Sequence, residues 1–231
     1  DLPGLAAFQE AAALGDGRRA GRDLPALGAH RREEPRLDWL SVLYAVAAQD
    51  LWDGEAWFEL ASRQAELARA TGTLSLLPYA LDYLAGYHIH AGQLSAAAGL
   101  LSEAEGLAPG MRAETLPYIP LQLAAWHGDA ATVARLARTM TAGAQLRGEG
   151  CALTVAGYAA AVLHNGLGEY RLALDCAQQA CAGDEVATAS WALPELVEAA
   201  SRAGRPDVAS AAAHRLSERA DASGTAWARG T

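Results

Sequence analysis

One pair of histidines and one pair of cysteines could, by residue type, support metal or redox chemistry. His88 and His90 form an HxH pair, and Cys176 and Cys181 lie five residues apart in the same segment. Both segments have helical sequence patterns, and residues two apart on a helix point to different faces, so the histidines are poorly placed to share one metal ion. A spacing of five on one helix is also poor geometry for a disulfide. We expect no metal site, and free thiols at Cys151, Cys176 and Cys181.

Catalytic signatures are absent from the sequence. The chain has no GxSxG, no HExxH and no glycine-rich phosphate loop, and all 18 of its basic residues are arginine. Without lysine, a Schiff-base nucleophile or a P-loop lysine is excluded. The 27 acidic residues give a net charge of -9, which is a poor match to phosphate backbones. We therefore expect a chain that is not an enzyme, binds no cofactor itself and makes no direct contact with nucleic acid.

Aromatic side chains with polar tips, interleaved with polar residues, are the best candidates for a binding surface. They stand thirteen, ten, six, three or two positions before one of four glycines, which places them on one face of a helix in each repeat. The candidates for a ligand- or partner-binding groove are Tyr79, Asp82, His90, Tyr118, Gln122, Trp126, Tyr158, Asn165, Trp191, Glu198 and Arg202. The alternative is that these aromatic residues pack between helices, because a chain with only two phenylalanines needs tyrosine and tryptophan for bulk.

The four glycines define a repeat that must position these side chains. Gly92, Gly128, Gly168 and Gly204 are spaced by 36, 40 and 36 residues. Five residues after each of them stands a small apolar residue: Ala97, Val133, Ala173 or Ala209. Glycine suits the left-handed backbone of a tight interhelical turn, and a small residue allows two helices to pack closely. This pattern resembles the tetratricopeptide repeat, whose helix hairpins stack into a continuous core.

The repeat pattern predicts an all-α fold of tandem antiparallel helix hairpins, tetratricopeptide-like, stacked into a right-handed superhelix. Residues 36–231 are expected to form this domain, with about five helix pairs, beginning with helices at 37–49 and 55–70. Residues 1–35 are expected to form an N-terminal helix and a linker rich in Gly, Pro and charge. The longer spacing of 40 residues predicts a long connection near residues 142–150.

Three longer segments carry a more specific resemblance. Residues 51–105, 161–180 and 191–230 are similar to the helical region of large ATP-binding LuxR-type transcriptional regulators from actinobacteria, which are MalT-like. The resemblance implies an inducer-sensing region between an ATPase module and a helix-turn-helix. Neither a GxxxxGK[ST] motif nor a basic recognition helix is found here, so ATP and promoter binding are expected in other parts of a larger protein. A start at Asp1 without methionine also suggests a fragment.

Three functions remain open from the sequence. The first is an effector- or partner-sensing domain of a cytoplasmic transcriptional regulator, in which a small molecule or a peptide binds the groove. The second is a scaffold for protein–protein interaction or self-association without a small-molecule site. The third, an α-helical enzyme, would require a cluster of ionisable groups that the sequence does not indicate. No apolar run reaches the roughly 20 residues needed to span a membrane, so no membrane contact is expected.

Overall fold

A computed structural model describes residues 47–107, 117–147, 150–182 and 189–230. Helices make up most of this part of the chain and it contains no strand, which confirms the predicted all-α class. The expected N-terminal helix and linker (1–35) lie outside the described residues, as does most of the expected helix 37–49. Residues 47–50 are helical and lead into α4 (Gly54–Thr71), the first helix that is complete within the described residues.

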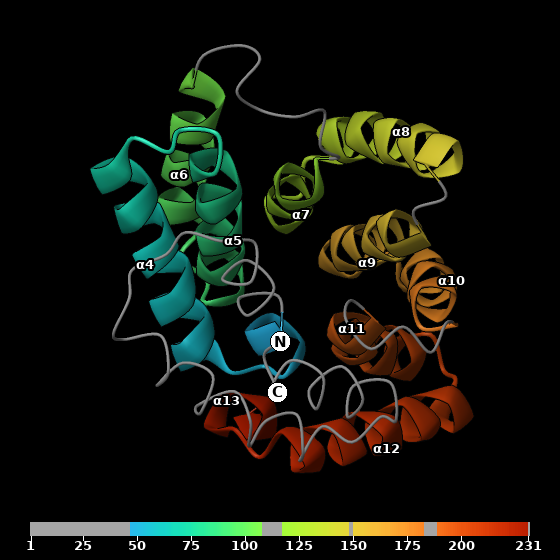
Figure 1. Cartoon of the computed structure of the whole chain (residues 1–231). Helices are drawn as coiled ribbons and strands as arrows, with labels where there is room; N and C mark the ends of the chain where they lie inside the picture. The colour runs from blue at the N-terminus through green and yellow to red at the C-terminus, as the bar shows by residue number, and fades with distance from the viewer. Residues whose placement is uncertain (1–46, 108–116, 148–149, 183–188, 231) are drawn as a thin grey trace.

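Four helix hairpins follow α4 in order. They are α5 (Leu77–His90) with α6 (Leu94–Gly106), α7 (Tyr118–Trp126) with α8 (Ala130–Arg147), α9 (Gly150–Gly166) with α10 (Tyr170–Ala180), and α11 (Ala189–Arg202) with α12 (Pro206–Ser223). A short helix, α13 (Ala226–Gly230), comes last. In Figure 1, α7, α9 and α11 lie toward the middle of the array, and α8, α10 and α12 lie outside them. The predicted tandem hairpins are therefore present.

Each hairpin turns at one of the predicted glycines. Gly92, Gly128, Gly168 and Gly204 all have a positive φ, between 72° and 75°. At the third turn the Gly168 N–H donates to the Asn165 carbonyl at 3.0 Å, and the Glu169 N–H donates to the His164 carbonyl at 2.8 Å. The His164 ring also pairs with the Glu169 carboxylate, with Nδ1 and Oε2 2.6 Å apart. This is a Schellman-type helix end, in which the left-handed residue allows the last carbonyls to find donors.

The small residues that follow the turns are buried, as predicted. Ala97 and Ala173 have no exposed surface, Val133 has 4% and Ala209 has 9%. The predicted long connection at 142–150 is wrong, because α8 continues to Arg147 and residues 142–147 are helical. Alanine, glutamine, leucine and arginine in that segment favour a helix, so the longer repeat mostly lengthens the second helix of its pair.

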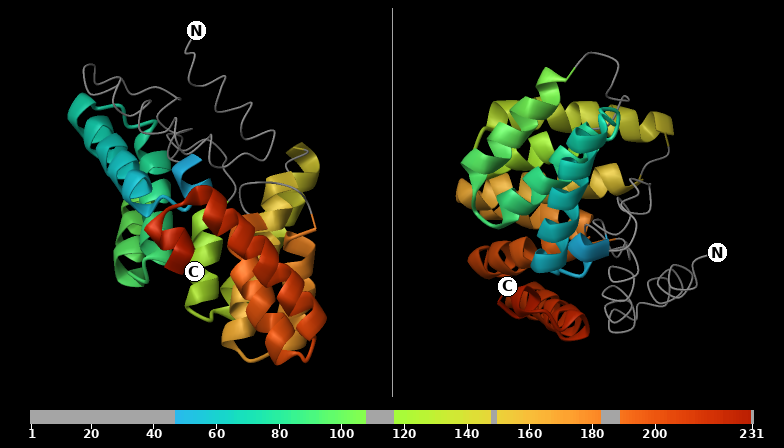
Figure 2. Two further views of the ribbon diagram at one scale, coloured as in Figure 1. Left: turned by 90° about the horizontal axis from the view of Figure 1, so that it is seen from below. Right: turned by 60° about the vertical axis from the view of Figure 1, so that its left-hand side comes forward.

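The C-terminal end of the array returns to its beginning. The Thr225 hydroxyl donates to the Trp52 carbonyl at 2.9 Å, and the Ser223 hydroxyl donates to the Leu51 carbonyl. Both views in Figure 2 place α12 and α13 beside the start of α4. Trp52 has a φ of 52°, unusual for a residue other than glycine, and such a conformation costs on the order of 1–3 kcal/mol. Trp52 accepts the hydrogen bond from Thr225, between α12 and α13, and its ring packs on Trp191 of α11.

A cluster of aromatic rings fills the space where the two ends meet. Trp57 on α4 is fully buried, and its ring centroid lies 6.0 Å from that of Trp191 on α11 and 6.3 Å from that of Trp227 on α13. Trp52 lies 5.3 Å from Trp191, and His90 on α5 lies 5.7 Å from Trp57. Aromatic pairs at such distances contribute about 0.5–1.5 kcal/mol each beyond the burial of their surface. We call these five residues the closing cluster.

Gly54 provides a direct test of this closure. A Cβ atom at Gly54 would overlap the six-membered ring of Trp227. Gly54→Ala should therefore lower the free energy of unfolding by about 1–3 kcal/mol, as overpacking does, and should change the tryptophan fluorescence. Urea unfolding measures the first effect. Gly99→Ala in α6, where the added methyl meets nothing, should raise stability by about 0.5–1 kcal/mol. Similar effects for the two substitutions would contradict the packing of Trp227 on Gly54.

A second matched pair tests the turn geometry. Gly168→Ala places an L side chain at a φ of 75°, which costs roughly 1–2 kcal/mol. Gly166→Ala lies two residues earlier in open space at the end of α9, without that backbone requirement, and should be neutral or stabilising. Thermal unfolding of both variants should show a lower midpoint for the first alone. Equal midpoints would argue against the left-handed turn.

Candidate functional site

The helices that line the inside of the array bring several of the predicted groove residues together. The His90 ring centroid lies 4.0 Å from that of Trp191 and 6.2 Å from that of Tyr158. Burial lowers the pKa of His90 to about 4, and the nearby Gln122 amide opposes this shift. His90 is therefore neutral at neutral pH. These four side chains come from α5, α7, α9 and α11, one from each hairpin, as the glycine register predicted.

Tyr158, on α9, is almost completely buried. Only 2% of it is exposed, and burial raises the pKa of its hydroxyl well above the ordinary value, with a further increase from the charge of Glu195. The Trp126 indole acts on the same hydroxyl in the opposite direction. Trp126 itself is 43% exposed, so this end of the group reaches the surface.

Asn165 and Glu195 connect α9 to α11. Asn165 Nδ2 donates to the Glu195 carboxylate at 2.8 Å and to the Glu195 carbonyl at 3.1 Å. Burial raises the pKa of Glu195, the hydrogen bond from Asn165 opposes this, and the charge of Glu198 adds to it. We call the following set the inner network: His90, Gln122, Trp126, Tyr158, Asn165, Trp191 and Glu195.

Several buried polar atoms in and beside the inner network have no hydrogen-bond partner within the described part of the chain. They are the acceptors Gln122 Oε1 and Asn165 Oδ1 and the indole N–H groups of Trp52 and Trp191. A buried polar atom left in this state costs about 1–3 kcal/mol. A bound molecule could form hydrogen bonds with these atoms.

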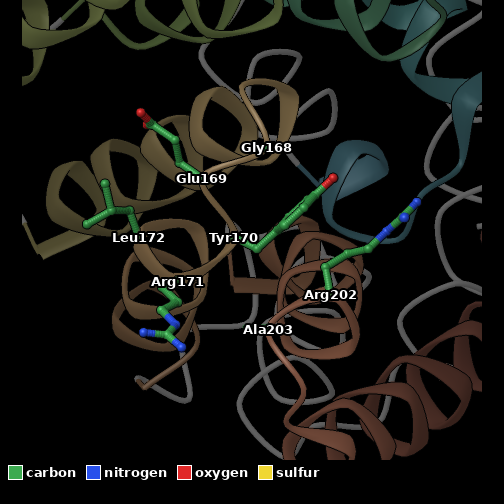
Figure 3. A pocket seen from close by; sticks show the side chains of 7 residues that line it. All are labelled: Gly168, Glu169, Tyr170, Arg171, Leu172, Arg202 and Ala203. Atoms are coloured by element: carbon green, nitrogen blue, oxygen red, sulfur yellow. The ribbon is translucent and has the colours of Figure 1, made fainter.

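The remaining predicted residues lie elsewhere. Arg202 stacks over the Tyr170 ring, with its guanidinium carbon 5.7 Å from the centroid. The two side chains lie next to each other in Figure 3, at an open hollow of about 380 Å³ lined by Gly168, Glu169, Tyr170, Arg171, Leu172, Arg202 and Ala203. Tyr79 and Tyr118 are half-buried, and Glu198 is exposed. Some of the predicted groove residues thus lie together in the interior, and the others lie at separate positions elsewhere.

Asp82 belongs to another group of ionisable residues, around Tyr83. Burial raises the pKa of Tyr83 to about 12, and the charges of Asp50, Cys151 and Asp82 contribute in that order. Burial also raises the pKa of Asp50 to about 7. The Tyr83 carbonyl accepts a hydrogen bond of 3.0 Å from the Trp57 indole, which connects this group to the closing cluster.

Sequence reasoning missed Glu195, Asp50 and three residues of the closing cluster. Trp52, Trp57 and Trp227 lie outside the four glycine-defined repeats, so the register could not place them. Glu195 stands nine before Gly204, one position from the expected inward set. No local signal marked these residues as a group.

Comparisons of the chain with protein-family models, curated proteins and solved structures find no match. Among the described residues no group of three or more His, Cys, Asp or Glu side chains could hold a metal ion. Within these same residues, Cys151, Cys176 and Cys181 form no disulfide bond. In the same part of the chain, none of the helices has the length and apolar character required to cross a bilayer.

Asp50 yields a pH-dependent prediction. Its carboxyl keeps a proton up to about pH 7 in the folded chain but ionises near pH 3.8 when unfolded, so its contribution to stability is lost as pH rises through that interval. Asp50→Asn should remove this dependence. We expect the stability of the variant relative to the native chain to increase from pH 4 to pH 7 and to level off above it.

Urea unfolding of both proteins across this pH range measures the difference. The titration of His90 is present in both proteins and therefore cancels to first order. Asp175→Asn, at an exposed carboxylate on α10, is the control and should show no such trend. A flat difference for Asp50→Asn would contradict the burial of Asp50.

Proposed function

We propose that this chain is a non-catalytic sensing domain of a transcriptional regulator, which binds an effector or a partner at the inner network. The observation that supports it is the convergence of side chains from four successive hairpins: His90, Gln122, Tyr158 and Trp191. Next to them Trp126, which acts on the Tyr158 hydroxyl, is exposed at the surface. The hydrogen-bonding capacity left unused in this interior supports binding over packing alone.

Binding at the inner network would act on the array as a whole. The hairpins meet at both the inner network and the closing cluster. A ligand that moves α5, α9 and α11 apart or holds them together would therefore change the contacts between the start of α4 and the α12–α13 segment. A ligand can bias such a change only by binding one arrangement better than the other. In this proposal the effect passes to an ATPase module and a DNA-binding module outside this chain.

The regulator context rests on the resemblance to the helical region of LuxR-type, MalT-like proteins over residues 51–105, 161–180 and 191–230. A cytoplasmic location belongs to the same proposal. The net charge of -9 supports placing DNA binding in another part of the regulator.

A metabolite screen by thermal shift, followed by calorimetry, tests the proposal. A ligand of the inner network should bind at least about fivefold more weakly to Trp126→Ala, because an aromatic anchor of this kind contributes more than about 1 kcal/mol. Phe58→Ala is the matched control, since Phe58 is also 43% exposed but lies on α4. We expect its affinity to be unchanged.

Two results would contradict this function. One is the absence of any binder among metabolites and among segments of a full-length regulator. The other is a binder that Trp126→Ala and Phe58→Ala weaken equally. Binding of a copy of this chain alone would favour the self-association scaffold instead.

A further inference from the structure

We propose that the inner network recognises a positively charged, N–H-rich group, a primary ammonium or a guanidinium, which binds at Glu195 and carries an apolar stem. This inference rests on the proposed function and specifies its ligand class. It starts from the Asn165–Glu195 contact between α9 and α11.

One buried acceptor at this contact has no donor within the described residues. Asn165 is 8% exposed; its Nδ2 donates to Glu195, and its Oδ1 has no hydrogen-bond partner within the described residues. Asn165 is also the only hydrogen-bond donor to the Glu195 carboxylate within the described residues. A ligand with several N–H groups could donate to both side chains at once, as an ammonium or a guanidinium does.

The electrostatic environment also favours a cation. Glu198, one turn further along α11, adds a second negative charge, and its effect on Glu195 raises the pKa of that carboxyl in addition to burial. His90 does not offset these charges at neutral pH, since burial lowers its pKa to about 4. Among the described residues, no cation contributes to the raised pKa of Glu195. An incoming positive charge would provide the missing compensation.

Aromatic surface next to these carboxylates suits the stem of such a ligand. Tyr158 lies close enough to Glu195 for the carboxylate charge to raise the pKa of its hydroxyl, and the exposed Trp126 indole lies at that same hydroxyl. Indole and phenol faces attract cations, and Trp is the strongest of the aromatic residues in this respect. Acceptors near Tyr158, with an exposed tryptophan acting on the same hydroxyl, would suit an aralkyl or alkyl amine or guanidine.

Three probes of similar shape and different charge test this inference. They are phenethylammonium, the neutral 2-phenylethanol and the anionic 3-phenylpropionate, each titrated into the full chain and followed by tryptophan fluorescence and by NMR chemical shifts. Because hydrogen bonds to charged groups are stronger than neutral ones, we expect phenethylammonium to bind about tenfold or more tightly than 2-phenylethanol.

Variants locate the effect. Glu195→Gln keeps an acceptor for Asn165 and should abolish the preference for the cation, and Glu198→Gln, at an exposed position that cannot disturb the core, should reduce it. Glu66→Gln makes the same charge change at an exposed position on α4 and should leave the preference intact.

Equal affinity for the three probes, or a preference that survives Glu195→Gln, would overturn the cationic assignment. If 2-phenylethanol or 3-phenylpropionate binds best and Trp126→Ala weakens it, the binding site stands and only the ligand class is wrong. If no probe binds, the cationic assignment falls, and the metabolite screen decides the proposed function separately.

Discussion

The packing of Trp227 on Gly54 is the constraint on which the arrangement of the array depends. Only a residue without a side chain leaves room for that ring at the start of α4. Trp227 then completes the contacts of Trp57 and Trp191, so the first helix described in full, the fourth hairpin and the last helix share one hydrophobic cluster. Stacked hairpins ordinarily contact only their neighbours. Here a direct hydrogen bond joins two residues about 170 positions apart in the chain, from the Thr225 hydroxyl to the Trp52 carbonyl.

This closure has consequences for the interior. With the ends held together, α5, α7, α9 and α11 direct their inward side chains at one another, and polar groups of Gln122 and Asn165 are buried with part of their hydrogen-bonding capacity unused. Trp52 keeps an unfavourable φ in the same region. Unpaired buried polar atoms and strained backbone both lower stability. Proteins commonly retain them at places that bind a ligand or change conformation. The proposed sensing function follows from this combination, in which a closed array contains a polar interior.

The turns could be predicted from sequence because their requirement is local. A positive φ at Gly92 or Gly168 and a small residue at Ala97 or Ala173 depend on a few neighbouring residues and recur with the repeat. The same register predicted that His90, Tyr158 and Trp191 share one groove, and in the structure their rings lie next to the His90 ring in the buried interior. The register also predicted Arg202 on this face, but Arg202 lies over Tyr170 instead. Which of the predicted positions meet depends on how successive hairpins are placed, and the repeat spacing does not specify that. The contacts of Trp57 with Trp227, and of Asn165 with Glu195, depend on helix placement over long separations, and no periodic pattern encodes them. The length of α8 was misjudged because a longer spacing does not say whether a helix or a loop has grown.

The contact between Gly54 and Trp227 can be measured directly in the unmodified chain by NMR. If the Trp227 ring covers the Cα of Gly54, ring currents will displace one Gly54 Hα resonance strongly upfield, and nuclear Overhauser effects will connect it to the protons of the six-membered indole ring. Both signals should disappear in Trp227→Leu. A Gly54 Hα at an ordinary chemical shift, without cross-peaks to Trp227, would show that the array is open and would contradict the account.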